Sequence, residues 1–186
     1  MNTKLSQRTS SKSLALEVSK HIAEILLLIG IGMIGVLLHA KFRIPLKLPG
    51  HHGIIYMALL ISGRLLSKKP YAASLSSVGA ALMLMFPLGF KDPFMPLIYL
   101  LPGFITDLGM VFGKKNKMNL FLIAIVCGLS YMTIPLSRII INVTTGFPYG
   151  SLLTGFLWPT FTHFVFGAVG GLAGTSLVRV FRKNKE

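Results

Sequence analysis

Acidic residues are scarce in this sequence of 186 residues. There are five Asp and Glu residues against nineteen Lys and Arg residues, which gives a formal net charge of +14. Two-carboxylate hydrolysis would require Asp92 and Asp107 to converge from opposite ends of one helix, and no nucleophile elbow, phosphate-binding glycine loop or His-Glu zinc motif is present. We therefore expect no enzymatic activity and no bound cofactor.

Cysteine and charge are equally sparse. The single cysteine, Cys127, excludes an intramolecular disulfide and a cysteine-based metal site, and we interpret it as a small packed residue in an apolar run. Charged residues make up 13% of the chain, whereas soluble domains have about 25%. The basic excess lies beside apolar segments, so we expect it to meet anionic lipid headgroups rather than nucleic acid.

Long apolar runs dominate what is present, because 53% of the residues are hydrophobic. Such runs predict an all-α integral membrane protein. We predict a bundle of six transmembrane helices over residues 21–178, with basic cytoplasmic tails at 1–20 and 179–186. The predicted spans are 21–40, 53–66, 71–90, 96–112 (broken near Pro102), 118–141 and 152–178. The second span reaches only about 21 Å at 1.5 Å per residue, against a hydrocarbon core of about 30 Å.

The distribution of cations predicts the orientation. Fourteen of the nineteen Lys and Arg residues fall on the segments that are inside if the N-terminus is cytoplasmic. The other five lie on the outer segments: Lys41, Arg43, Lys47, Lys91 and Arg138. Because cytoplasmic loops carry the excess of basic residues, we predict a cell-membrane protein with both termini in the cytoplasm.

Small residues recur at helical spacing in several spans. The last span carries two overlapping pairs, Gly167 with Gly171 and Gly170 with Gly174, on adjoining faces. This spacing lets helix backbones approach closely, so we predict tight packing of the last helix there.

The connector at residues 41–53, KFRIPLKLPGHHG, joins the first two spans. Its prolines and glycines predict an irregular segment, which persists at membrane depth only where it packs on protein or lines a cavity. His51 and His52 suit hydrogen bonding to an organic ligand or capping of the following helix. A metal site would need further ligands, for which only His39 and His163 are available.

The outer segments 43–53 and 142–151 are predicted to cover a ligand site. Polar and aromatic side chains that can converge there are Arg43, His51, His52, Tyr99, Arg138, Tyr149, Trp158 and His163. With cations and rings but few acids, such a site suits an anionic or aromatic small molecule.

Asp107 has two interpretations, because an ionisable group within a span is costly. It can pair with Arg64, or lie near the inner interface beside Lys114 and Lys115. Alternatively, Asp107, Arg64 and Arg138 line a transport pathway.

The plan of the chain resembles a known family. The segment IPLKLPGHHGIIYMALLISGRLLSKKPYAASLSSVGAAL, with its Pro-containing outer loop, short helix, basic turn and small-residue helix, is similar to the substrate-binding S components of energy-coupling factor (ECF) transporters, including the biotin-type ones. The local likeness covers about residues 43–81. The resemblance implies a vitamin, a vitamin precursor or a metal ion bound near the outer surface. It also implies a membrane coupling subunit and two cytoplasmic ATPases as partners.

Two features depart from the family pattern. The first helix offers Gly32 and Gly35 instead of an Ala-xxx-Ala docking face, and the motifs expected for biotin are absent. Two other classes remain open. One is a self-sufficient small transporter or channel, and the other is a non-transporting membrane scaffold that binds a partner through its glycine faces.

Overall fold

The computed structural model describes residues 2–41, 48–86, 92–113 and 119–184, with only the backbone described for residues 2–14 and 39. Within these ranges the chain is all-helical and contains no strand. The helices are α1 (Asn2–Lys41), α2 (Gly53–Leu66), α3 (Ala72–Met85), α4 (Met95–Phe112), α5 (Leu120–Thr145) and α6 (Leu157–Lys183), with a short 3₁₀ helix η2 (Gly150–Leu152) before α6.

Four helices are long and apolar enough to cross a membrane: residues Ala15–Leu38 of α1, and α4, α5 and α6. Many large apolar side chains on their outer surfaces are exposed, as on Phe104 of α4, Phe121 of α5 and Phe161 of α6. Together these features indicate a membrane-embedded protein. The other two described helices, α2 and α3, are apolar but have only 14 residues each.

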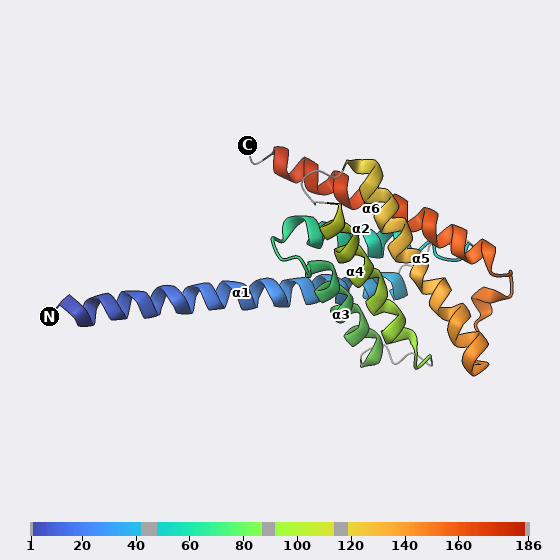
Figure 1. Cartoon of the computed structure of the whole chain (residues 1–186), viewed down its shortest axis with the longest axis horizontal. Helices are drawn as coiled ribbons and strands as arrows, with labels where there is room; N and C mark the ends of the chain where they lie inside the picture. The colour runs from blue at the N-terminus through green and yellow to red at the C-terminus, as the bar shows by residue number, and fades with distance from the viewer. Residues whose placement is uncertain (1, 42–47, 87–91, 114–118, 185–186) are drawn as a thin grey trace.

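The short helix α2 lies at the centre of the packing. The other helices form an arc in the order α1, α3, α4, α5, α6, and α2 contacts all five of them (Figure 1). Along α2, only Leu66 at its C-terminal end is exposed. The residues buried around it, including Tyr56, Met57 and Ile61, form the centre of the hydrophobic core.

Glycines bring neighbouring helices close together. The sequence of the last span predicts this packing. Gly167 and Gly171 face α5, whereas Gly170 and Gly174 face α2. A Cβ at Gly170 would lie 2.6 Å from the carbonyl oxygen of Ile54, so a branched side chain has no room there. Each glycine pair therefore serves a different contact within the chain.

Two glycines of α1 are also covered by neighbouring helices. Gly32 packs on the backbone of Ser76 in α3, and Gly35 packs on Tyr56 and Leu59 in α2. These glycines hold α1 in the bundle, so they are not available as a docking face for another subunit.

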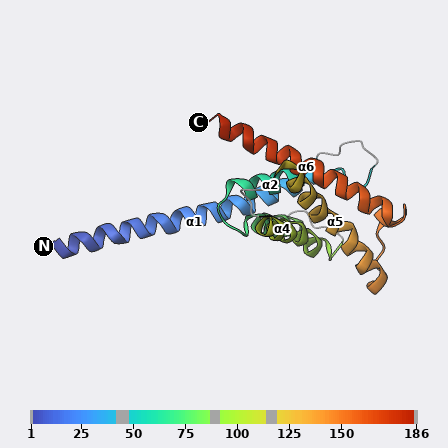
Figure 2. The same cartoon turned by 45° about the horizontal axis from the view of Figure 1, so that its top comes forward.

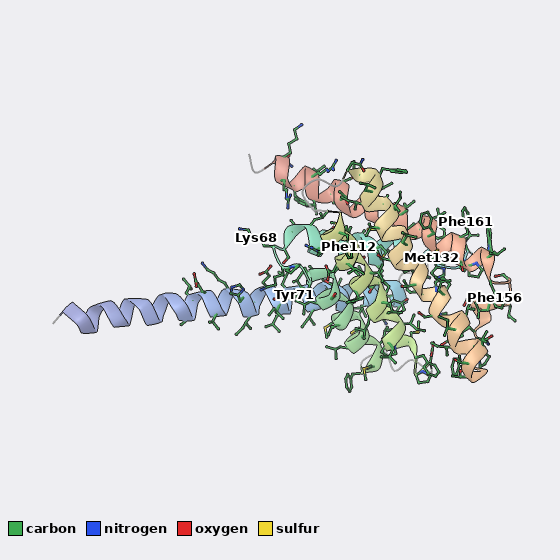
Figure 3. All side chains as sticks on the ribbon, in the orientation of Figure 1. Lys68, Tyr71, Phe112, Met132, Phe156 and Phe161 are labelled. Carbon is green, nitrogen blue, oxygen red and sulfur yellow. The ribbon has the colours of Figure 1, made fainter. Side chains whose placement is uncertain are left out.

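The bundle has two ends that differ in their connections. The turn end contains the 67–71 turn, the C-terminus of α4, the N-terminus of α5 and the C-terminus of α6. The loop end contains residues 48–52, 92–94 and 146–156. The N-terminal part of α1 projects beyond the turn end (Figures 1 and 2). Lys68 and Tyr71 mark the turn end in Figure 3, and Phe156 and Phe161 lie at the other.

Several helix boundaries differ from the sequence prediction. The helix of the first span extends back to Asn2 through the segment predicted as a tail, and α3 ends at Met85, before the predicted limit of residue 90. The predicted break near Pro102 is wrong, because α4 continues through this residue. Neighbouring helices hold the backbone here: the Tyr56 hydroxyl donates a hydrogen bond to the carbonyl of Tyr99, three residues before the proline, at 3.2 Å.

Candidate functional site

A cavity of about 150 Å³ opens at the loop end. It lies among the start of α2, the N-terminal halves of α4 and α6 and the C-terminal half of α5. Its lining residues are Pro49, Gly50, His52, Tyr99, Tyr131, Ile134, Arg138, Ser151 and His163. Four residues predicted from the sequence to form a ligand site, His52, Tyr99, Arg138 and His163, therefore line one cavity.

The connector before α2 forms one wall of this cavity. Gly50 has φ +83°, a left-handed conformation that favours glycine, and a Cβ there would lie 2.7 Å from Nδ1 of His163. The turn closes with a 2.8 Å hydrogen bond from the Gly53 amide to the Gly50 carbonyl. This compact turn packs Gly50 against His163 of α6, and His52 follows in the cavity lining.

The two adjacent histidines have different environments. His51 is buried beside the cavity rather than in its lining, and its Nδ1–H donates to the Leu48 carbonyl at 2.6 Å. The rings of His51 and His52 lie 3.8 Å apart. Burial, and then the neighbouring His51, lower the pKa of His52, which favours its neutral form. Although His52 occupies the N-cap position of α2, its side chain makes no capping hydrogen bond, so the capping interpretation is wrong.

Arg138 of α5 reaches the cavity from the opposite side. Its Nη1 lies 3.5 Å from the Ser151 hydroxyl, and its guanidinium group lies over the ring of Tyr149 at 5.6 Å from the centroid. The Tyr149 hydroxyl donates to Asp92 at 3.4 Å. Burial, and then the Asp92 carboxylate, raise the pKa of Tyr149 to about 12, so this hydroxyl stays protonated. Tyr149 thus covers Arg138 without lining the cavity itself.

Tyr131 lines the cavity but was missed by the sequence prediction. Its ring stacks on His163 with centroids 5.0 Å apart and an interplanar angle of 26°. The Nδ1–H of His163 donates to the Pro159 carbonyl at 2.7 Å, which fixes the ring orientation. Tyr131 and Ile134 precede Arg138 by seven and four residues, so helical periodicity places all three on one face of α5. That spacing was the available signal.

Besides His51 and Tyr149, two more predicted site residues are not placed in the cavity lining. Trp158 lies on α6 but is 47% exposed and does not line the cavity. Trp158 precedes His163 by five residues, which is a rotation of about 140° around a helix with 3.6 residues per turn, so the indole does not share the face of His163. Arg43 lies outside the described residues.

The turn end holds a buried ion pair instead of a polar cavity. Nε of Arg64 in α2 lies 2.7 Å from Oδ1 of Asp107 in α4, and both side chains are less than 10% exposed. The same carboxylate accepts hydrogen bonds from the backbone amides of Ala73 and Ser74 and from the Ser74 hydroxyl. Asp107 therefore caps the N-terminus of α3 from a neighbouring helix. Its predicted pairing with Arg64 is confirmed.

Two further hollows have less polar linings. A groove of about 390 Å³ lies beside the loop end against Tyr149, Leu152 and Phe156, and its rim residue Leu153 is 89% exposed. A hollow of about 130 Å³ lies between α1 and α2 near Glu24. Neither gathers several ring and cationic side chains, so the 150 Å³ cavity is the stronger candidate for a small-molecule site although it is not the largest.

Metal ligands do not cluster in the described part of the chain, where no group of three His, Cys, Asp or Glu side chains is arranged to hold an ion. The His39 side chain lies outside what is described. Comparison with known proteins finds no matching family model, no matching curated protein and no matching solved structure.

Proposed function

We propose that this chain is a membrane-embedded, non-enzymatic substrate-binding subunit that takes up a vitamin-like small molecule. In this proposal the chain spans the cell membrane six times with both termini in the cytoplasm, so the loop end faces outward. The observation that carries the proposal is the convergence of His52, Tyr99, Arg138 and His163 on one cavity at that end. A concave site with rings and a few convergent polar groups is typical of small-molecule binding.

The distribution of polar groups supports binding over free passage. Arg64 and Asp107 pair with each other at the turn end, whereas Arg138 lies at the loop end. These three residues therefore do not line one continuous pathway, which weakens the interpretation as a self-sufficient channel. The glycine pairs of α6 are occupied by α5 and α2, which removes the motivation for a scaffold that binds partners through them.

Uptake then requires an energy source outside this chain. The resemblance of residues 43–81 to S components of ECF transporters suggests a separate membrane coupling subunit and two cytoplasmic ATPases. Since Gly32 and Gly35 are covered by α3 and α2, the coupling subunit would contact a different surface of the bundle.

One tagged protein tests the proposal. With an affinity tag after Glu186, the chain purified from its native membrane should carry a membrane subunit and two ATPases, and the complex should drive ATP-dependent uptake in proteoliposomes. Protease added outside intact cells should not remove the tag. Solute flux through the purified chain alone, without ATP, would support the channel instead. Removal of the tag from outside would overturn the orientation.

A further inference from the structure

Arg138 contributes a positive charge to the cavity wall, and its contacts in the described structure are weak. Its Nη1 is 3.5 Å from the Ser151 hydroxyl, at the limit of a hydrogen bond. Its buried Nε atom makes no hydrogen bond to any described residue. The remaining contact is the ring of Tyr149. The guanidinium group therefore keeps much of its donor capacity for another partner.

The carboxylates of the described residues form no ion pair with Arg138. The five acids are Glu17, Glu24, Asp92, Asp107 and Glu186. Among described residues, the two ion pairs are Arg64 with Asp107 and Lys69 with Glu24, both at the turn end. Asp92 is the one acid described at the loop end, and it accepts hydrogen bonds from the Phe94 amide and the Tyr149 hydroxyl. An anion from outside the chain would complete the surroundings of Arg138.

The geometry of the guanidinium group selects the kind of anion. Its planar fork matches the two oxygens of a carboxylate, and such charge-assisted pairs are stronger than neutral hydrogen bonds. His52 favours its neutral form, so it adds no second positive charge at neutral pH. Among the described lining residues Arg138 is the one arginine or lysine, which favours a ligand with a single negative charge.

The other walls and the size of the cavity limit the rest of the ligand. Tyr99, Tyr131 and Ile134 add flat or apolar surfaces to the same lining. A protein cavity of about 150 Å³ is large enough for one benzene molecule. The cavity therefore encloses about one ring, and any larger part of a ligand would extend through its opening.

We infer that the cavity binds a small monocarboxylate that carries one planar ring. The carboxylate pairs with Arg138, and the ring lies against Tyr99, Tyr131 and Ile134. This inference rests on the proposed function only in using the same cavity, because it specifies the class of ligand and makes no claim about how uptake is driven.

Binding of simple probes to the purified full-length chain tests the ligand class. The probes are benzoate, phenylacetate and the three pyridine monocarboxylates, each compared with its own amide by isothermal titration calorimetry at pH 7.5. At least one carboxylate should bind ten or more times as tightly as its amide, a difference of about 1.4 kcal/mol. The inference is overturned if no carboxylate binds at millimolar concentrations, or if the amides bind equally well.

Substitution of the cation gives the matched test. Arg138→Gln should remove the preference for carboxylate over amide, and Arg138→Lys should retain part of it because the charge remains. Arg179→Gln makes the same change at an exposed site at the turn end and should leave the preference unchanged. Equal losses in Arg138→Gln and Arg179→Gln would show that only the overall charge matters, which would contradict the site.

The outcomes separate this inference from the proposed function. Carboxylate binding through Arg138 without ATPase partners or ATP-dependent uptake would leave the ligand class intact and reject the transport proposal. ATP-dependent uptake of a neutral or cationic solute that is unaffected by Arg138→Gln would support the transport proposal and reject the ligand class.

Discussion

Arg64 is buried and Arg138 is half-buried, and the two arginines have different partners at the two ends of the bundle. At the turn end, Arg64 forms a 2.7 Å ion pair with Asp107, which also caps α3. At the loop end, Arg138 contacts a hydroxyl group and a ring beside a cavity. The chain has only five acids, and one of them pairs with Arg64, which indicates a structural site. An arginine left beside a cavity marks a site where the charge can come from a ligand.

The largest expected loss of stability comes from breaking the ion pair between Arg64 and Asp107. Asp107→Ala leaves Arg64 buried without its anion and removes the cap of α3, so we expect a loss of about 3–5 kcal/mol in the free energy of unfolding. Arg64→Met should cost less than Asp107→Ala, because the carboxylate loses its cation but keeps the hydrogen bonds from Ala73 and Ser74. Unfolding of the purified protein in detergent, followed by circular dichroism, measures both.

Arg138→Met is the matched control for this prediction. It removes an arginine that has no carboxylate partner among the described residues, so we expect a change of about 1 kcal/mol or less. If Arg138→Met were as destabilising as Arg64→Met, the distinction between a structural and a ligand-binding arginine would fail.

A smaller loss of stability is expected from disturbing the packing of α6 on α5. In Gly171→Leu the new Cβ would lie 2.6 Å from Cβ of Cys127 in α5, so α6 must shift away. Overpacking of this kind costs about 1–3 kcal/mol. Gly30→Leu is the control, because a Cβ at Gly30 meets no atom within 4 Å. Thermal unfolding should distinguish the two variants, and equal melting temperatures would contradict the packing of α6 on α5.

The smallest effect concerns protonation at the loop end. The pKa of His52 is lowered in the folded protein, so below the ordinary value of 6.5 the unfolded chain binds more protons than the folded one. Stability should therefore be fully present above pH 6.5 and decrease as the pH falls below it. The drop in melting temperature from pH 7.5 to pH 5.5 should be smaller in His52→Asn than in the parent. An unchanged drop would show that His52 does not contribute.

The sequence predicted the helical class, the bounds of α2 and the faces of the glycine pairs, because each depends on local composition or periodicity. It also gave the pairing of Asp107 with Arg64 as one of the interpretations of an acid within a span, and the structure shows this pair. The cap on α3 could not be predicted, because it depends on how α3 and α4 are placed side by side. Tyr131 was missed because within an apolar run it has the pattern of a core residue; its spacing from Arg138 was a signal, and its position opposite Gly53 and His163 places it at the cavity.

Trp158 shows the opposite error. Its position near the predicted outer loop made it a candidate, but a residue at the start of a helix turns toward or away from a site according to the helix phase. The phase is fixed by how α6 packs: Gly167 faces α5 and Gly170 faces α2, and Trp158 is left 47% exposed. Depth along the chain alone could therefore not place the indole.

The central position of α2 has a consequence for biogenesis. One face of α2 is covered by α6, where Gly170 and Gly174 pack on it and the Ser62 hydroxyl donates to the Gly174 carbonyl at 3.3 Å. During synthesis α2 emerges early, whereas α6 emerges last of the six helices described here. That face of α2 thus stays open until α6 has been synthesised, so a truncated product that ends before α6 would present it to the membrane quality-control machinery.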